Sequence, residues 1–256
     1  NLSDLSGNGR DASSGGQEVW EDGQYGQAFT FSGDDHLYAP GYKAIGGTSA
    51  RTLSFWMKTT HDNWMTLAYW GDNEEAKKWD LRLYRNDFQL QLNRPARRTY
   101  ADNLINGLWH HLALTLQEGG DGYEDISIFV DGKEADNYGQ WNWTKKETVN
   151  GEEEDVPIRI NTGSSSDFHI GKRSYSTWSR FIGAIDEVRL YGVALSSFEI
   201  ESIAKEGTTG LEDLGKESFT ISLWAKPEKL VSEMDYEFAA GWYEKTGNEY
   251  MQATMK

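Results

Sequence analysis

The feature that most limits the fold of this chain is a series of short segments in which apolar and polar residues alternate. Alternating side chains lie on opposite faces of a β-strand, so one face of each segment can be buried. Turn-forming Gly, Asn and Asp residues separate the segments. The expected strands are Gly26–Phe31, His36–Ala39, Thr52–Lys58, Trp64–Trp70, Trp79–Tyr84, Asp87–Leu92, Trp109–Leu116, Asp125–Val130, Ile158–Asn161, Asp167–Gly171 and Ile182–Tyr191. Many short strands with turns between them predict an all-β, antiparallel two-sheet sandwich or jelly roll.

Two of these segments show the period of two most clearly. Every second residue of Leu112–Leu116 is Leu, and Ile126–Val130 has a β-branched apolar residue at every second position. Asp131 and Gly132 follow, and both residue types accept the positive φ that a two-residue hairpin turn requires.

One short helix is expected near residue 200. Ser196 and Glu199 have the spacing of a capping box, in which the hydroxyl and the carboxylate bond the first free backbone amides. Ile200 and Ile203 give the helix an apolar stripe, and Gly207 fits just past its end.

Composition excludes several classes of function. The 25 basic and 41 acidic residues give a formal net charge of −16, which disfavours binding to nucleic acid and to anionic membranes. The chain has no cysteine, so disulfides, thiolate catalysis and Cys-ligated metals are absent. No apolar run approaches the roughly 18 residues of a membrane-spanning helix, so membrane insertion is not expected.

An imperfect internal repeat divides the chain. Thr52–Lys58 resembles Thr220–Lys226, but the second copy lacks the leading strands of the first and stops after two or three strands. So few strands cannot bury a core alone. We therefore expect a module at residues 1–207 and, at 208–256, a partial second repeat or a strand-donating tail. The tail is either the clipped start of a second module, a set of extra strands on the first, or strands that add to a neighbouring molecule.

Several motifs occur in a familiar order. They are Asp4–Asp11, Tyr25–Gly33, Leu53–Lys58, Leu108–Ala113, Ile128–Lys133, Ile170–Gly171, Phe181–Tyr191 and Ala194–Ser196. The ordered set resembles the laminin-G-like jelly-roll modules of the concanavalin A-like lectin/glucanase superfamily, as found in bacterial surface and secreted proteins. The resemblance implies two antiparallel sheets, often a bound calcium, and roles in glycan binding or adhesion.

Calcium is the expected cofactor. Unbroken alternation in Ile182–Tyr191 puts Asp186 among core-facing apolar residues, where a carboxylate needs a cation, hydrogen-bond donors or a proton. Asp4, Asn8 and Asp34 offer further oxygen ligands of the kind that calcium accepts. The resemblance implies that the opening loop and the closing strand lie together, which would let these four residues share an ion. Alternatively, Asp186 accepts backbone amide hydrogen bonds and the loop is only a turn.

Aromatic residues in polar surroundings are the candidate glycan contacts. Trp141 and Trp143 stand two apart, so both point the same way in an extended segment, and Tyr175 and Trp178 lie in a polar loop. Flat rings stack on the apolar faces of sugars, while neighbouring amides bond sugar hydroxyls. The alternative for each of the four is plain packing.

An enzymatic role finds little support. Glycosidases need two carboxylates that flank the scissile bond. Asp186 and Glu187 point to opposite faces of a strand, and so do Glu124 and Asp125. Neither a nucleophile elbow nor a phosphate-binding loop is present.

The sequence therefore predicts a non-catalytic, extracellular or cell-surface, calcium-stabilised module of a repetitive surface protein. Its expected partners are glycans or cell-surface glycoconjugates, and its expected role is carbohydrate binding or adhesion. Two alternatives stay open. One is a self-assembly module of a fibre or surface layer, joined by strand exchange between copies. The other is a polysaccharide-degrading enzyme of the same superfamily.

Overall fold

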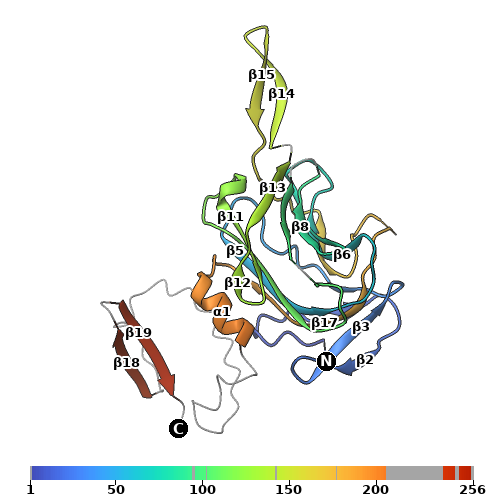
Figure 1. Ribbon diagram of the computed structural model, residues 1–256, viewed down its shortest axis with the longest axis vertical. Helices are drawn as coiled ribbons and strands as arrows, with labels where there is room; N and C mark the ends of the chain where they lie inside the picture. The colour runs from blue at the N-terminus through green and yellow to red at the C-terminus, as the bar shows by residue number, and fades with distance from the viewer. Residues whose placement is uncertain are drawn as a thin grey trace. The chain divides into compact units, whose positions relative to one another are not determined.

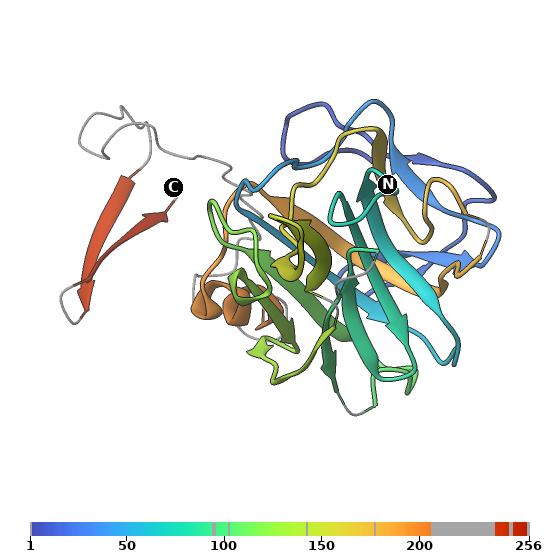
Figure 2. The same ribbon diagram turned by 90° about the horizontal axis from the view of Figure 1, so that it is seen from above.

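The alternating segments fold into two antiparallel sheets that form a jelly-roll sandwich (Figure 1, Figure 2). A computed structural model describes residues 2–93, 96–101, 103–141, 143–176, 178–205, 239–245 and 248–254. The eight-stranded sheet has the order β1 (Ser13–Ser14), β4 (Leu37–Ala39), β16 (Ser166–Ile170), β6 (Met65–Gly71), β7 (Lys78–Tyr84), β8 (Asp87–Gln91), β9 (Ala96–Tyr100), β13 (Asn137–Trp141). The seven-stranded sheet has the order β12 (Lys133–Glu134), β11 (Ile126–Val130), β10 (His110–Leu116), β5 (Arg51–Lys58), β17 (Ile182–Tyr191), β3 (Gln27–Ser32), β2 (Trp20–Asp22).

The predicted periodicity and hairpin turn are confirmed. Strand β10 pairs with β11, with Leu114 opposite Ile128, and the leucines of β10 lie fully buried in the core. Asp131 and Gly132 both have positive φ, 50° and 77°, and turn the chain directly into β12. This two-residue turn joins β11 to β12, whereas β10 and β11 are connected through residues 117–125, and their register follows from the alternating apolar residues of both strands.

The prediction of a strand at Ile158–Asn161 is wrong. Ile158 and Ile160 are buried, as their alternation predicts. However, the backbone amides of this stretch donate to carbonyls in three different segments. Ile158 donates to Trp143, Ile160 donates to Asp121, and Asn161 donates to Ala76. The apolar side chains anchor a connecting segment that has no single partner strand.

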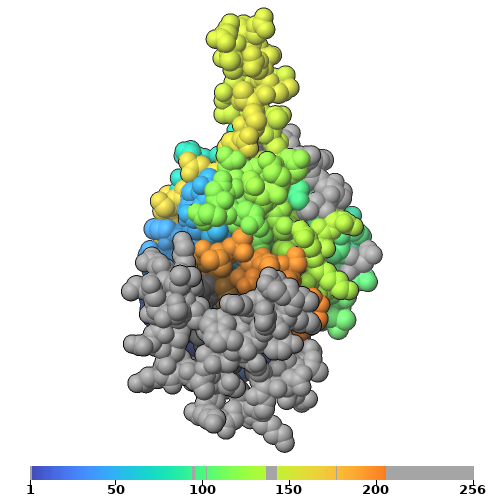
Figure 3. Space-filling view, turned by 90° about the vertical axis from the view of Figure 1, so that its left-hand side faces the viewer, coloured from blue at the N-terminus to red at the C-terminus, as the bar shows by residue number. Residues whose placement is uncertain are grey.

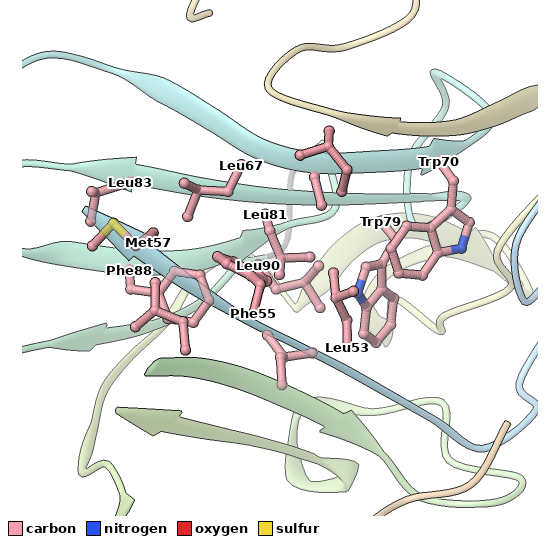
Figure 4. Packing of buried hydrophobic residues seen from close by; sticks show 14 of the residues in the cluster. Leu53, Phe55, Met57, Leu67, Trp70, Trp79, Leu81, Leu83, Phe88 and Leu90 are labelled. Carbon is pink, nitrogen blue, oxygen red and sulfur yellow. The ribbon is translucent and has the colours of Figure 1, made fainter. Parts of the chain in front are cut away.

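One apolar core fills the space between the sheets (Figure 4). Leu53, Phe55 and Met57 of β5 face the other sheet, which contributes Leu81 and Leu90 among others. At one end the rings of two tryptophans, Trp70 and Trp79, stack with centroids 5.5 Å apart.

Arg51 is a fully buried cation at this end of the sandwich. Its guanidinium lies 4.8 Å from the ring centroid of Trp79 and donates to the carbonyls of Ile45, Gly46, Gly47 and Ser49. A fifth hydrogen bond reaches the Thr162 hydroxyl at 3.0 Å. One side chain thus satisfies most of the polar groups that residues 45–49 bring into the sandwich.

The predicted helix is confirmed as α1 (Ser197–Lys205). The Ser196 hydroxyl donates to the Glu199 carboxylate at 2.7 Å, and the Glu199 amide donates back to the hydroxyl. Ile200 packs on Ala113 and Phe129, on the outer face of the seven-stranded sheet. In Figure 3, α1 (orange) lies beside the green strands of that sheet. No helix in the described part of the chain has the length and apolarity to cross a membrane.

Two further elements belong to the same part of the chain as the sandwich. A short 3₁₀ helix, η1 (Tyr123–Asp125), precedes β11. The strands β14 (Thr144–Val149) and β15 (Glu152–Pro157) form a separate hairpin, which extends beyond the sheets (Figure 1, Figure 3). Its side chains are exposed or partly exposed on both faces, and Lys146 pairs with Asp155 across it at 3.0 Å.

The chain divides into two units, Asn1–Thr220 and Ile221–Lys256. In the second unit, β18 (Ala239–Lys245) and β19 (Asn248–Thr254) form an antiparallel hairpin. The expected module boundary at residue 207 and the repeated segment Thr220–Lys226 lie outside the described residues.

Candidate functional site

Strands β7, β8 and β9 turn their charged and polar side chains to the outer face of the eight-stranded sheet, because the alternate apolar residues fill the core. The outward residues include Lys78, Asp80, Arg82 and Tyr84 on β7, Asp87 and Gln89 on β8, and Arg98 and Tyr100 on β9. The loop between β16 and β17 adds Arg173 and Tyr175, which contact Asp80 and Lys78, and the exposed Trp178, whose neighbour Ser179 is hydrogen-bonded to β6. We call these eleven residues the outer-face cluster.

A buried carboxylate, Asp80, lies at the centre of this cluster. Its Oδ2 accepts two hydrogen bonds from Arg82, from Nη2 at 2.6 Å and from Nε at 2.9 Å. Arg173 Nε lies 3.2 Å from the same oxygen and Lys78 Nζ lies 3.8 Å from it. The other oxygen, Oδ1, is buried and has no hydrogen-bond partner among the described residues. Asp80 thus gathers three cations and keeps one acceptor atom free.

The pKa of Lys78 shows that little solvent reaches this site. The pKa of the Lys78 ammonium is lowered to about 8, because burial, together with the neighbouring Arg82 and Arg173, outweighs the attraction to Asp80. The ammonium also donates to the Tyr175 hydroxyl at 3.2 Å. Lys78 therefore ties the loop to the sheet and holds Tyr175 over the face.

Aromatic rings border the cluster on two sides. Tyr175 and Trp178 are exposed, and Trp178 has 80% of its surface in solvent. Ser179, beside Trp178, accepts a hydrogen bond from the Thr66 amide of β6 at 2.6 Å, so this part of the loop runs along the sheet. At the other end of β7, Trp64 stacks on Tyr84 with ring centroids 4.4 Å apart. The face thus combines flat rings with clustered hydrogen-bonding groups.

One of the four predicted glycan contacts, Tyr175, lies on this face, where it contacts Lys78 and Tyr69. Trp178 is exposed in the same loop. Trp143 does not lie on this face: its ring is buried, and its Nε1 donates to the carbonyl of Ala96 at 3.1 Å. For Trp143 the packing alternative is therefore correct. Trp141 ends β13, and its side chain lies outside the described residues.

The predicted calcium ligands of the opening loop form a hydrogen-bonded turn. Burial opposes ionisation of Asp4, but hydrogen bonds from Ser6 and from the Arg10 amide outweigh it and lower the pKa of the carboxyl. Asn8 donates to the Ser6 hydroxyl at 2.8 Å. Asp34 lies elsewhere, exposed to solvent, with Arg180 Nη1 at 3.3 Å.

Asp186 faces away from the core, which corrects the expectation from alternation. A β-bulge between Asp186 and Arg189, with Glu187 at a φ of 51°, breaks the period of two in β17. Asp186 therefore pairs with Trp56 on the outer side of the seven-stranded sheet, while Leu190 still packs on the core. Burial raises the pKa of the Asp186 carboxyl, although backbone amide hydrogen bonds act against this.

The carboxylate of Asp186 fastens the turn between β2 and β3. Its Oδ2 accepts from the Tyr25 amide at 2.9 Å, and its Oδ1 accepts from the Glu187 amide at 2.9 Å. A Cβ on Gly23 would lie 2.5 Å from Oδ2, so only glycine leaves room for this contact. The amide-acceptor alternative thus describes Asp186.

The four predicted ligands do not form one site. Asp4 and Asn8 bond within their own loop, Asp34 bonds Arg180, and Asp186 bonds the turn at Gly23–Gly26. Among the described residues, no three His, Asp or Glu side chains gather closely enough to hold a metal. These residues therefore do not fit a shared calcium ion.

Sequence reasoning missed most of the outer-face cluster. In Lys78–Tyr84, every second residue is charged or aromatic and the intervening residues are Trp or Leu. Asp87–Gln91 alternates in the same way. Charged or polar residues at every second position of two consecutive strands are the signal that could have identified the site, because they place these side chains on one outer face. An ordinary solvated face carries mixed polar residues and does not gather several cations around one carboxylate.

Comparisons with known proteins agree with this architecture. The model of the family described as concanavalin A-like lectin/glucanases superfamily (Laminin_G_3) matches residues 31–201. A search of the curated proteins found no match.

Solved structures with the same fold include sugar- and receptor-binding domains. Domain 4 of AbnA, an extracellular arabinanase from Geobacillus stearothermophilus in complex with arabinotriose, is 20% identical, with a TM-score of 0.53 over 80% of this chain and 93% of that one. The binding domain of botulinum neurotoxin serotype G is 12% identical, with a TM-score of 0.52 over 97% of this chain and 62% of that one. The binding domain of Paraclostridial Mosquitocidal Protein 1 is 15% identical, with a TM-score of 0.51 over 79% of this chain and 49% of that one. At these identities the likeness shows the fold.

Proposed function

Because the chain belongs to the concanavalin A-like lectin/glucanase superfamily, we propose that it is a non-catalytic glycan-binding module whose ligand lies on the outer-face cluster. One observation carries the proposal: the exposed ring of Tyr175 contacts a buried, hydrogen-bonding set centred on Asp80, and the exposed Trp178 follows in the same loop. Sugars present both kinds of surface, apolar ring faces and hydroxyls, so one face can meet both.

The rest of the predicted role belongs to the same proposal. We place the module outside the cell, in adhesion to surface glycans, in keeping with the formal net charge of −16. We treat it as non-catalytic because Asp80 is engaged by Arg82 and Arg173 and does not stand as one of two unshielded carboxylates. Released reducing ends after incubation with polysaccharides would contradict the non-catalytic part.

Trp178→Ala and Tyr175→Ala are each expected to weaken glycan binding about tenfold, or about 1.4 kcal/mol, because each removes a ring that can stack on a sugar. Binding would be measured by isothermal titration calorimetry. The titrant would be the best binder from an oligosaccharide panel that includes arabinotriose and oligogalacturonates.

Phe198→Ala is the matched control for these variants. Phe198 is another exposed aromatic side chain, but it belongs to α1, whose Ile200 packs on the opposite sheet. We expect this variant to bind like the unmodified chain. If all three variants bind equally well, the glycan does not lie on the outer-face cluster.

Calcium binding is a separate proposal, at a position other than the four predicted ligands. A thermal melt in calcium should then give a higher Tm than a melt in chelator, because an ion bound only to the folded state stabilises it by mass action. The double variant Asp4→Asn, Asp186→Asn should keep this rise. Equal melting temperatures in calcium and in chelator would remove the proposal.

A further inference from the structure

The outer-face cluster carries more positive than negative charge. Lys78, Arg82 and Arg173 surround one carboxylate, that of Asp80. Their side chains are 3%, 15% and 12% exposed, so solvent screens them weakly. Asp80 balances one of these three charges.

A fourth cation extends the positive charge across the sheet. Arg98 of β9 lies 3.3 Å from Asp87 and donates to the Gln89 side chain at 3.2 Å. The register aligns Arg82, Gln89 and Arg98 in one row across β7, β8 and β9. Adjacent strands are about 4.8 Å apart, so the two arginines start roughly 10 Å apart at the backbone.

The excess of positive charge contrasts with the rest of the chain. The four cations and two carboxylates of the cluster give it a net charge of +2. The whole sequence has a formal charge of −16. Burying uncompensated cations costs stability, so a cluster that served only to fasten the loop would gain from a second acid. An anionic ligand supplies that missing charge.

Resting on the proposed function, we infer that the ligand is an acidic glycan whose carboxylate or sulfate groups bind the Arg82–Gln89–Arg98 row. Guanidinium groups recognise both kinds of anion through paired, charge-assisted hydrogen bonds. Tyr175 and Trp178 stack on the sugar rings beside this row.

Polygalacturonate and its fully methyl-esterified form test the inference, because esterification removes the charge and leaves the sugar rings in place. We expect the acidic polymer to bind about tenfold more tightly, and this preference to shrink as salt rises. Chondroitin sulfate, before and after desulfation, forms the second arm. A larger loss on desulfation assigns sulfate as the preferred anion, and a larger loss on esterification assigns carboxylate.

Arg98→Gln should reduce the preference for the acidic polymer about fivefold while binding to the esterified polymer stays unchanged. Arg159→Gln is the matched control, since it removes one positive charge from an exposed arginine that pairs with Asp121 instead. Equal binding of acid and ester would overturn the acidic-glycan inference and leave glycan binding standing. No binding to any glycan of the panel would overturn both proposals. Circular dichroism and thermal melts confirm that each variant is folded.

Discussion

Arg51→Met is expected to lower the free energy of unfolding by about 3–5 kcal/mol, the largest loss that we predict for one side chain. Methionine fills similar space, but it cannot donate to the four carbonyls of residues 45–49 or to the Thr162 hydroxyl. These acceptors then lose their partner in a site closed to water. Urea unfolding followed by tryptophan fluorescence measures the loss, provided that the m-value stays constant.

Two further variants separate charge from geometry. Arg51→Lys keeps the positive charge, but a single ammonium cannot span the same acceptors, so we expect it to recover less than half of the loss. Arg159→Met removes an exposed arginine and should change stability by no more than about 0.5 kcal/mol. A loss below about 1 kcal/mol in Arg51→Met would show that the loop carbonyls find other donors.

The chain is expected to lose stability as the pH falls from about 6.5 towards 4, because His111 resists protonation in the folded state. Burial and the nearby charge of Arg189 together lower its pKa to about 4, against the attraction of Asp131. Neither ring nitrogen has a hydrogen-bond partner among the described residues. With an ordinary pKa near 6.5 when unfolded, the unfolded chain binds more protons in this range, so folding weakens as pH falls.

The expected size of this effect follows from the same two pKa values. His111 alone contributes about 3 kcal/mol, of which about 2 kcal/mol disappears between pH 7 and pH 5. His169 has a pKa of about 4 because of burial and of the neighbouring His36, and it adds in the same direction. The raised pKa of the Asp186 carboxyl opposes both histidines.

His111→Phe tests the assignment, because phenylalanine keeps the ring contact with Trp56 and cannot take up a proton. Unfolding free energies at pH 7 and pH 5 should differ by about 2 kcal/mol less in this variant than in the unmodified chain. An identical pH dependence in the two proteins would mean that His111 is not buried as a neutral ring.

Sequence reasoning works well where one face of a strand is buried and fails where neither face is. The pairing of β10 with β11 is set by apolar residues at every second position of both strands. By contrast, Glu152–Pro157 of β15 has acidic residues on both faces and gives no periodic signal. Strand β9 is similar, because Ala96–Tyr100 brings only short or charged side chains to its inner side.

The functional residues were harder to predict because they depend on contacts between segments that are distant in sequence. Asp186 was assigned to the core on the assumption of unbroken alternation, and the bulge at Glu187 reverses its face. Asp80 and Arg173 are 93 residues apart and meet only through the pairing of β16, β6 and β7. Tyr175 and Trp178, in contrast, sit in a loop whose polar composition already indicated exposure.

The β14–β15 hairpin gives the module a place where the chain can grow. Its strands leave and re-enter the sandwich side by side, with Thr144 opposite Pro157, and its tip at Asn150 and Gly151 lies at the far end. An extra peptide spliced into that tip would leave the hydrophobic interior and the charged row untouched. New binding loops or whole domains can therefore be added at this tip during evolution, and a reporter can be added by design, without a change in the fold.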